Sequence, residues 1–168
     1  MSNRMKHEDS FAYSSFFDYY CEEPDFSGMT SCLKVQGDKV IGVCVDKVKL
    51  YYMKQAKLPG FRVIDNIGDA DVYEMDLLNP LNKSEMDEIK EKVSGLNNRL
   101  FRFSQDDFNY VLDSFGANTA NAIQKTFDKY KKCYLDITED QFLKDSKGNI
   151  YCVDALMDID LYEEIQNS

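Results

Sequence analysis

The chain has 168 residues, of which 20 are Lys or Arg and 30 are Asp or Glu, so its formal net charge is −10. A hydrophobic content of 43% at this length is enough to bury a core, which excludes a wholly disordered chain. The acidic excess argues against non-specific nucleic-acid binding, which needs Lys and Arg to displace counterions, and against docking on anionic membranes. We therefore expect one domain or two small lobes, with neither nucleic acid nor a membrane as partner.

Targeting signals and cysteine motifs are absent from the sequence. No apolar run approaches the ~20 residues of a membrane helix, and the polar N-terminus lacks the apolar core of a secretory signal, so we expect a cytoplasmic protein. The five cysteines form no CxxC pair, and the only histidine, His7, lies in the polar tail. This pattern predicts reduced, buried cysteines and argues against a zinc site, a disulfide framework and a histidine-based triad.

The first half of the chain alternates between short β-prone runs and turn residues. After a polar tail and a short aromatic helix over residues 10–21, the apolar run 40–45 predicts a strand buried on both faces. The turn residues Gly68 and Asp69 predict a hairpin. The elements expected here are strands over 33–35, 40–45, 61–67 and 71–77 and a short helix over 47–57.

The apolar pattern becomes helical from residue 83 onward. Ser84 with Asp87, and Ser104 with Asp107, are spaced like the caps of two helices. The elements expected here are helices over 84–100, 105–115, 118–133 and 158–165, and a hairpin formed by 142–144 and 149–153. Segregated strands and helices predict an α+β fold, with an N-terminal tail and short helix (1–24), a strand-rich lobe (25–78) and a truncated helical lobe (79–168).

The stretch from Tyr134 to Asp154 carries the most chemical information. Asp136 follows a predicted helix at the start of a loop, and Asp154 follows the second strand of the predicted hairpin. This layout brings two carboxylates to one end of the hairpin, where one suits a hydroxyl proton and the other suits Mg²⁺ on a polyphosphate. Two structural alternatives stay open: Asp136 as the cap of a turn, and Asp154 as a solvated strand end.

Here the sequence resembles the protein-kinase superfamily, whose catalytic loop and hairpin have the pattern HRDLxxxN, then a turn, then DFG. Asp136 and Asp154 match the two aspartates of that pattern, 18 positions apart (154 − 136), and Asp145–Ile150 matches its frequent D-x-x-G-N-I turn. The resemblance implies that Asp136 is the catalytic base, that Asp154 binds Mg²⁺, and that Gln141 stands at the second metal-ligand position.

Upstream segments follow the kinase order along the chain. Phe26–Ser31 lies where a kinase has its phosphate loop, and the strand at 72–78 lies where it has its fifth strand and hinge. The resemblance therefore implies a minimal two-lobed kinase-like fold with ATP and Mg²⁺ as cofactors. The residues it places near the nucleotide are Gly28, Thr30, Glu74 and Asp76. The likeness covers about residues 25–160 and is to the compact kinases of bacteriophages and bacterial effectors.

The sequence departs from the kinase pattern at positions that hold phosphate and metal. Gly42 stands where the third strand carries its lysine, and the helix over 47–57 has no glutamate to pair with one. Gln141 replaces an asparagine. Because phosphoryl transfer depends on positioning and charge neutralisation, we expect these changes to cost orders of magnitude in rate. The substitute cations nearby are Lys34, Lys47 and Lys49, each more typical of a solvated surface.

We therefore favour a degenerate kinase-like protein, or pseudokinase, that acts by binding a protein partner, with or without a magnesium nucleotide. One alternative is an active, atypical Ser/Thr kinase in which Asp136 is the base, Asp154 binds Mg²⁺ and a displaced lysine grips phosphate. A second alternative, suggested by the net charge of −10, is an acidic interaction or inhibitor protein unrelated to kinases. The likeness to phage and effector kinases implies a protein partner or substrate in the host cytoplasm, among host or bacterial machinery.

Overall fold

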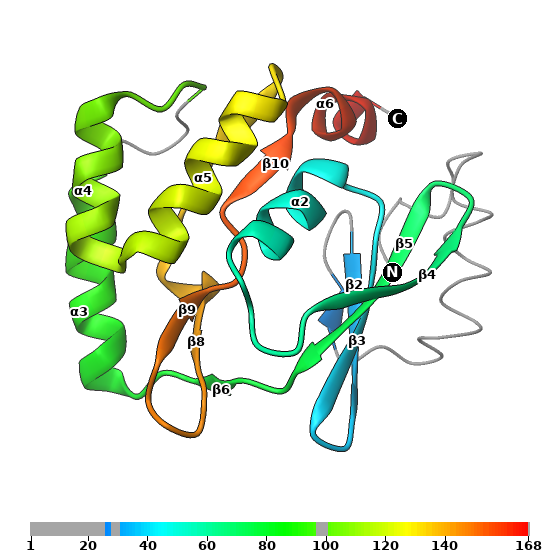
Figure 1. Ribbon diagram of the computed structural model, residues 1–168, viewed down its shortest axis with the longest axis horizontal. Coiled ribbons are helices and arrows are strands. Elements are labelled where there is room, and N and C mark those ends of the chain that lie inside the picture. The colour runs from blue at the N-terminus through cyan, green and yellow to red at the C-terminus, as the bar shows by residue number, and fades with distance from the viewer. Residues whose placement is uncertain (1–25, 28–30, 97–100, 168) are drawn as a thin grey trace. The chain divides into compact units, whose positions relative to one another are not determined.

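The β-prone runs of the first half form one antiparallel sheet in the computed structural model, which describes residues 26–27, 31–96 and 101–167. The strand order is β1-β2-β3-β5-β4, as Figure 1 shows for β2 to β5. The bounds are β1 Phe26–Ser27, β2 Ser31–Gln36, β3 Lys39–Cys44, β4 Arg62–Ile67 and β5 Ala70–Asp76. The four strands predicted from the sequence are confirmed, whereas the predicted helix over 10–21 lies outside the described residues.

The apolar pattern of β3 explains its central place in this sheet. All its residues from Val40 to Cys44 are buried, as predicted for a strand covered on both faces. The core cluster on one face combines three strands of the sheet. Its members are Cys32, Ile41, Val43, Ala70 and Val72.

Gly42 is the one small residue of β3, and a tyrosine fills its place. Gly42 lies directly opposite Tyr73 in the β3–β5 register, and Tyr73 is almost fully buried. A methyl group added at Gly42 would overlap the phenol ring of Tyr73. Position 42 therefore has no room for a lysine side chain while Tyr73 keeps this rotamer.

The second half of the chain forms helices and two small ladders, β7 with β10 and β6-β8-β9. The elements and bounds are α2 Lys47–Gln55, β6 Asn79–Pro80, α3 Lys83–Ser94, α4 Gln105–Phe115, α5 Ala117–Lys129, β7 Cys133–Leu135, the 3-10 helix η2 Glu139–Gln141, β8 Phe142–Lys144, β9 Ile150–Cys152, β10 Leu156–Asp158 and α6 Ile159–Asn167. The short strands β1, β6, β7 and β10 escape the sequence patterns because two or three residues show no period. The fold class is α+β, as predicted.

The chain divides into two compact units. Among the described residues, unit 1 comprises those up to Lys47, Pro59–Leu77 and those from Asp160 onward, and so carries the five-stranded sheet. Unit 2 comprises Val48–Leu58 and Leu78–Ile159, and so carries the helices α3 to α5, both small ladders and most of α2. The core of unit 2 includes the fully buried side chains Tyr52, Val111, Ile123, Thr126, Leu135, Ile137 and Leu156.

Three helix boundaries differ from the sequence prediction, and in the first case α3 ends at Ser94, with Gly95 as its C-cap, rather than at residue 100. The N-cap of α3 is Asn82 rather than Ser84, because Asn82 and Glu85 form a reciprocal capping box. Helix α5 ends at Lys129 rather than at 133, because Tyr130 already has extended backbone dihedrals and the chain continues into β7. By contrast, the predicted Ser104–Asp107 capping box of α4 is confirmed.

Two further sequence predictions concern burial and membrane insertion. Cys32, Cys44, Cys133 and Cys152 are buried thiols that form no disulfide within the described residues, as predicted, and Cys21 lies outside those residues. In the part of the chain that the structure describes, no helix has the length and apolar character needed to cross a bilayer.

Replacing Gly42 by alanine should destabilise unit 1 through overlap with Tyr73. We expect Gly42→Ala to lower the free energy of unfolding by about 1–3 kcal/mol, measured by urea denaturation. In a Tyr73→Leu background the same substitution should cost clearly less, since the ring that it meets is gone. An equal cost in both backgrounds would show that the Tyr73 ring is not the obstacle.

Candidate functional site

The two candidate aspartates lie at the same end of the β7–β10 ladder in unit 2. Leu135 pairs with Leu156 in this ladder, and the Asp136 N–H donates to the Ala155 carbonyl oxygen at 3.0 Å. Asp136 thus immediately follows the ladder on one strand, and Asp154 lies just before it on the other. The sequence predicted their proximity from the hairpin alone, but it placed a helix, not strand β7, before Asp136.

The hairpin of β8 and β9 is held by the carboxylate of Asp145. That carboxylate accepts hydrogen bonds from the backbone N–H of Lys147 and of Asn149, both at 2.9 Å, and from the Tyr151 hydroxyl at 3.2 Å. The side-chain amide of Asn149 donates a further bond to it at 3.0 Å. These bonds fix the turn predicted over Asp145–Gly148, and thereby fix the strand that ends just before Asp154.

The third charged group of the site is Lys49, which comes from α2. Its Nζ lies 3.1 Å from Oδ2 of Asp154, and the two side chains are 15% and 34% exposed. Lys49 is largely buried and Asp154 is about a third exposed, so salt and water screen this ion pair less than a pair on the open surface. The carboxylate that the kinase resemblance assigns to Mg²⁺ is therefore bound to an ammonium group in this structure.

Tyr52 explains why Lys49 reaches Asp154. The two α2 residues are three positions apart and so share a helix face. Tyr52 is fully buried, and its hydroxyl donates to the Cys152 carbonyl oxygen at 2.7 Å, two residues before Asp154. Burial, followed by the electrostatic interaction with the Cys152 side chain, raises the pKa of Tyr52 well above its ordinary value of 10.0. The neutral phenol thus fixes this face of α2 to the end of β9.

The thiol of Cys152 lies at the same buried anchor. Burial raises the pKa of Cys152 from 9.0 to about 12, which keeps the thiol protonated at physiological pH. Its Sγ also contacts the Asp154 carbonyl oxygen at 3.5 Å. Cys152 therefore serves to pack the end of β9 and is unsuited to act as a nucleophile.

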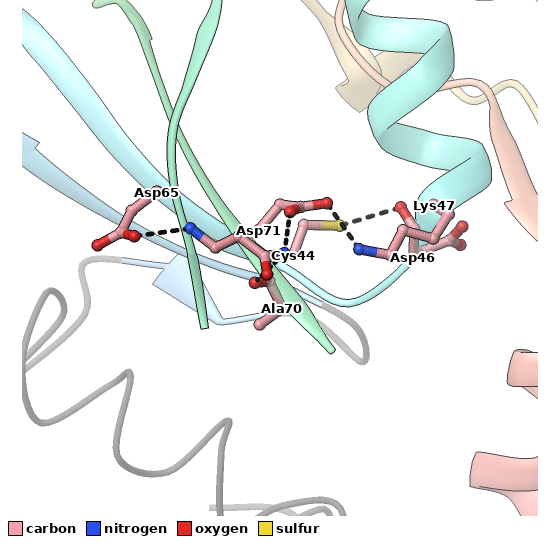
Figure 2. A network of polar contacts seen from close by, with 7 residues as sticks. Cys44, Asp46, Lys47, Asp65, Ala70 and Asp71 are labelled. Atoms are coloured by element: carbon pink, nitrogen blue, oxygen red, sulfur yellow. Dashed lines mark hydrogen bonds and ion pairs between the residues drawn. The ribbon is translucent and has the colours of Figure 1, made fainter. Parts of the chain in front are cut away.

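Lys47, at the start of the same helix, has a different partner. It lies two positions from Lys49, so it projects from another side of α2. Its Nζ lies 2.7 Å from Oδ2 of Asp71 in unit 1, and Figure 2 shows this contact within a polar network around the β4–β5 turn. Asp71 also accepts a hydrogen bond from the side chain of Asn66. Of the lysines weighed from the sequence, Lys49 is the one that contacts a candidate site residue; Lys34 lies on β2 of unit 1.

Gln141 lies next to Asp154 but turns its side chain inward. The Gln141 carbonyl oxygen accepts the Val153 N–H at 2.9 Å, which joins the two segments. Its side-chain oxygen accepts the Thr138 N–H at 3.0 Å and so closes the η2 turn. An amide oxygen has two lone pairs, so a metal would have to share this oxygen with the η2 turn.

The residues predicted near the adenine belong to unit 1. Glu74 pairs with Arg62 and Asp76 pairs with Lys39, in both cases between neighbouring strands of the sheet. The backbone N–H of Asp76 donates to Pro59 and that of Leu77 donates to Asp38, each at 2.9 Å. These two amides are thus already used within the chain. The predicted phosphate-loop residues Gly28 and Thr30 lie outside the described residues.

The donor set of unit 2 suits a metal that arrives with a phosphate ligand. Nowhere in the described ranges do three or more His, Cys, Asp or Glu side chains form a group that could hold a metal ion. Mg²⁺, however, commonly takes one or two carboxylates and completes its shell with phosphate oxygens and water. Asp154, with Asp136 beside it, fits that second mode.

Comparisons with known proteins identify no relative. No protein family model, no curated protein and no solved structure matches the chain. The site is therefore interpreted from its own geometry.

Removing the Tyr52 hydroxyl should weaken unit 2. We expect Tyr52→Phe to lower the free energy of unfolding by about 1–3 kcal/mol, because the buried Cys152 carbonyl loses its donor. Tyr110→Phe is the matched control, since the half-buried Tyr110 hydroxyl donates to Lys92 at the same distance of 2.7 Å. Chemical denaturation measures both, and a larger loss in the control would contradict the anchoring role of Tyr52.

The Asp145 turn should make stability depend on acidic pH. Hydrogen bonds, first from the Asn149 side chain and then from backbone N–H groups, hold the pKa of Asp145 below its ordinary value of 3.8. Its stabilising contribution is thus complete above about pH 4 and disappears as the pH falls through the lower folded-state pKa. Thermal melts of the wild type and of Asp145→Asn should differ most above pH 4 and converge in stronger acid. A difference that grows in acid would contradict this.

Proposed function

We propose that this chain is a kinase-like protein that binds a magnesium nucleotide through unit 2, transfers phosphate poorly and acts by binding a protein partner. One observation carries the proposal: Asp136 and Asp154 flank the end of the β7–β10 ladder, and Lys49 contacts Asp154 at 3.1 Å. Two carboxylates and an ammonium group are the charges that a metal–polyphosphate site needs.

The order of elements along the chain supports the same interpretation. A small antiparallel sheet, interrupted by helix α2 between β3 and β4, precedes the helices, and the loop, hairpin and second aspartate come last. This is the succession that the kinase resemblance implies. The Asp145 turn and the short β8–β9 hairpin also agree with the D-x-x-G-N-I pattern.

Poor phosphoryl transfer is expected from what replaces the usual phosphate and metal ligands. Tyr73 fills the space at Gly42, so no lysine side chain is present at that position of β3, and the lysine that β3 does carry, Lys39, pairs with Asp76. Gln141 uses its side-chain oxygen in the η2 turn. Since transfer depends on positioned charges around the phosphate, a protein that lacks two of them would act mainly through what it contacts. The partner that this proposal implies is a protein of the host cytoplasm.

A second candidate function is an active, atypical Ser/Thr kinase. The Lys49–Asp154 contact favours it, because Lys49 can replace the missing strand lysine as the phosphate ligand. Asp136 would then accept the substrate hydroxyl proton, and in the described part of the chain no hydrogen bond or ion pair engages its carboxylate.

Calorimetric titration with ATP and Mg²⁺ tests the proposed nucleotide site. We expect metal-dependent binding to the wild type that Asp154→Asn weakens at least about tenfold, since the carboxylate that would hold the metal is lost. Asp113→Asn, on the exposed side of α4, is the matched control and should bind like the wild type. Nucleotide binding that is absent, or unaffected by Asp154→Asn, would overturn the proposed site and favour the acidic interaction protein.

A transfer assay with labelled ATP separates the two kinase-like functions. Label that appears in the chain or in a host lysate, and disappears with Asp136→Asn while nucleotide binding persists, would establish the active kinase. Binding without transfer would establish the degenerate form.

A further inference from the structure

We propose that the Lys49–Asp154 ion pair makes metal and polyphosphate bind interdependently, because Lys49 competes with a divalent cation for Asp154 until a phosphate takes over its ammonium group. This inference rests on the proposed function and concerns the same site. It assigns Lys49 a role as a positioning residue that suppresses binding of free metal and favours the metal–nucleotide complex.

The contact of the two charges is the source of the competition. The Lys49 side chain is 15% exposed and the Asp154 side chain 34% exposed, so the pair is partly buried and water screens it only in part. A free divalent ion that takes the Asp154 carboxylate must first separate it from the ammonium of Lys49. The ion would also bring a second positive charge close to that ammonium.

The anchoring of α2 prevents the helix from relieving this conflict. Tyr52 fixes the Lys49 face of the helix through its hydrogen bond to Cys152. The α2 residues Leu50 and Met53 are also buried. The group that can move is the flexible side chain of Lys49 itself. An anionic phosphate that binds near Lys49 would give its ammonium group a new partner in place of Asp154.

A polyphosphate also supplies oxygen ligands for Mg²⁺ that the protein itself lacks. Gln141 uses its side-chain oxygen in the η2 turn, and Asp154 and Asp136, at the same end of the β7–β10 ladder, are the carboxylates that would hold the metal. Phosphate oxygens fill the remaining positions around Mg²⁺ and neutralise Lys49 at the same time. Because coupling between two ligands is reciprocal, the metal and the phosphate should each raise the affinity for the other.

The test compares free metal with the metal–nucleotide complex in one set of variants. Binding of Mn²⁺ without any phosphate is followed by electron paramagnetic resonance, and binding of Mg²⁺–ATP by calorimetry. For Lys49→Met we expect about tenfold tighter Mn²⁺ binding and about tenfold weaker Mg²⁺–ATP binding than for the wild type, a range typical of coupled sites. Lys47→Met is the matched control, because Lys47 pairs with Asp71 instead, and it should change neither.

Two further variants secure the result. Lys49→Arg keeps the positive charge, so it should keep Mn²⁺ binding as weak as in the wild type; it also remains informative if Lys49→Met fails to fold. Asp154→Asn should abolish the gain in Mn²⁺ binding when it is combined with Lys49→Met.

The outcomes separate this inference from the proposed function. Suppose that the wild type binds Mg²⁺–ATP and that Asp154→Asn loses this binding. Mn²⁺ binding to Lys49→Met that is unchanged or weaker would then overturn the proposed competition but leave the nucleotide site intact. If the wild type binds no Mg²⁺–ATP, the proposed function fails, and the relief by polyphosphate fails with it.

Discussion

The structure of unit 2 depends on the hydrogen bond from the Tyr52 hydroxyl to the Cys152 carbonyl oxygen. It joins residues 100 positions apart, it is fully buried, and it fixes one face of α2 to the end of β9. The Lys49 side chain shares that face and Asp154 follows β9, so this bond sets the distance between the two charges. The buried side chains of Val48, Leu50 and Met53 hold α2 in unit 2 as well, and the Tyr52 bond adds a directional contact to the end of β9.

Charge pairing then determines what the candidate site can do. Tyr73 leaves no room for a lysine side chain at Gly42, and Lys49 from the helix that follows β3 contacts Asp154. The positive charge near Asp154 thus comes from a helix rather than from the sheet. Under the proposed function, Lys49 would serve as the phosphate ligand, and its contact with Asp154 would set how metal and phosphate compete.

Much of the fold could be predicted from local patterns. The continuous apolar run of β3, the Gly68–Asp69 turn and the Ser104–Asp107 capping box each depend on residues close in sequence, and each appears as predicted. The predictions fail where two residues compete as a helix cap or where a strand is too short to show a hydrophobic period. Asn82 caps α3 because its partner Glu85 reaches back to it, and the three-residue strands β7 and β10 are too short to show any period.

The sequence by itself determined the order of the longer strands and of the helices, the α+β class and the spacing of Asp136 and Asp154 around the hairpin, because hydrophobic period, turn residues and spacing are local properties. Only the tertiary structure decided which lysine meets Asp154, what fills the space at Gly42 and where the Gln141 side chain points. Those outcomes depend on contacts between segments distant along the chain, or on the rotamer that a turn imposes. Lys47 and Lys49 are the same residue type and lie two positions apart. Only the packing of α2 makes Lys47 the partner of Asp71 and Lys49 the partner of Asp154.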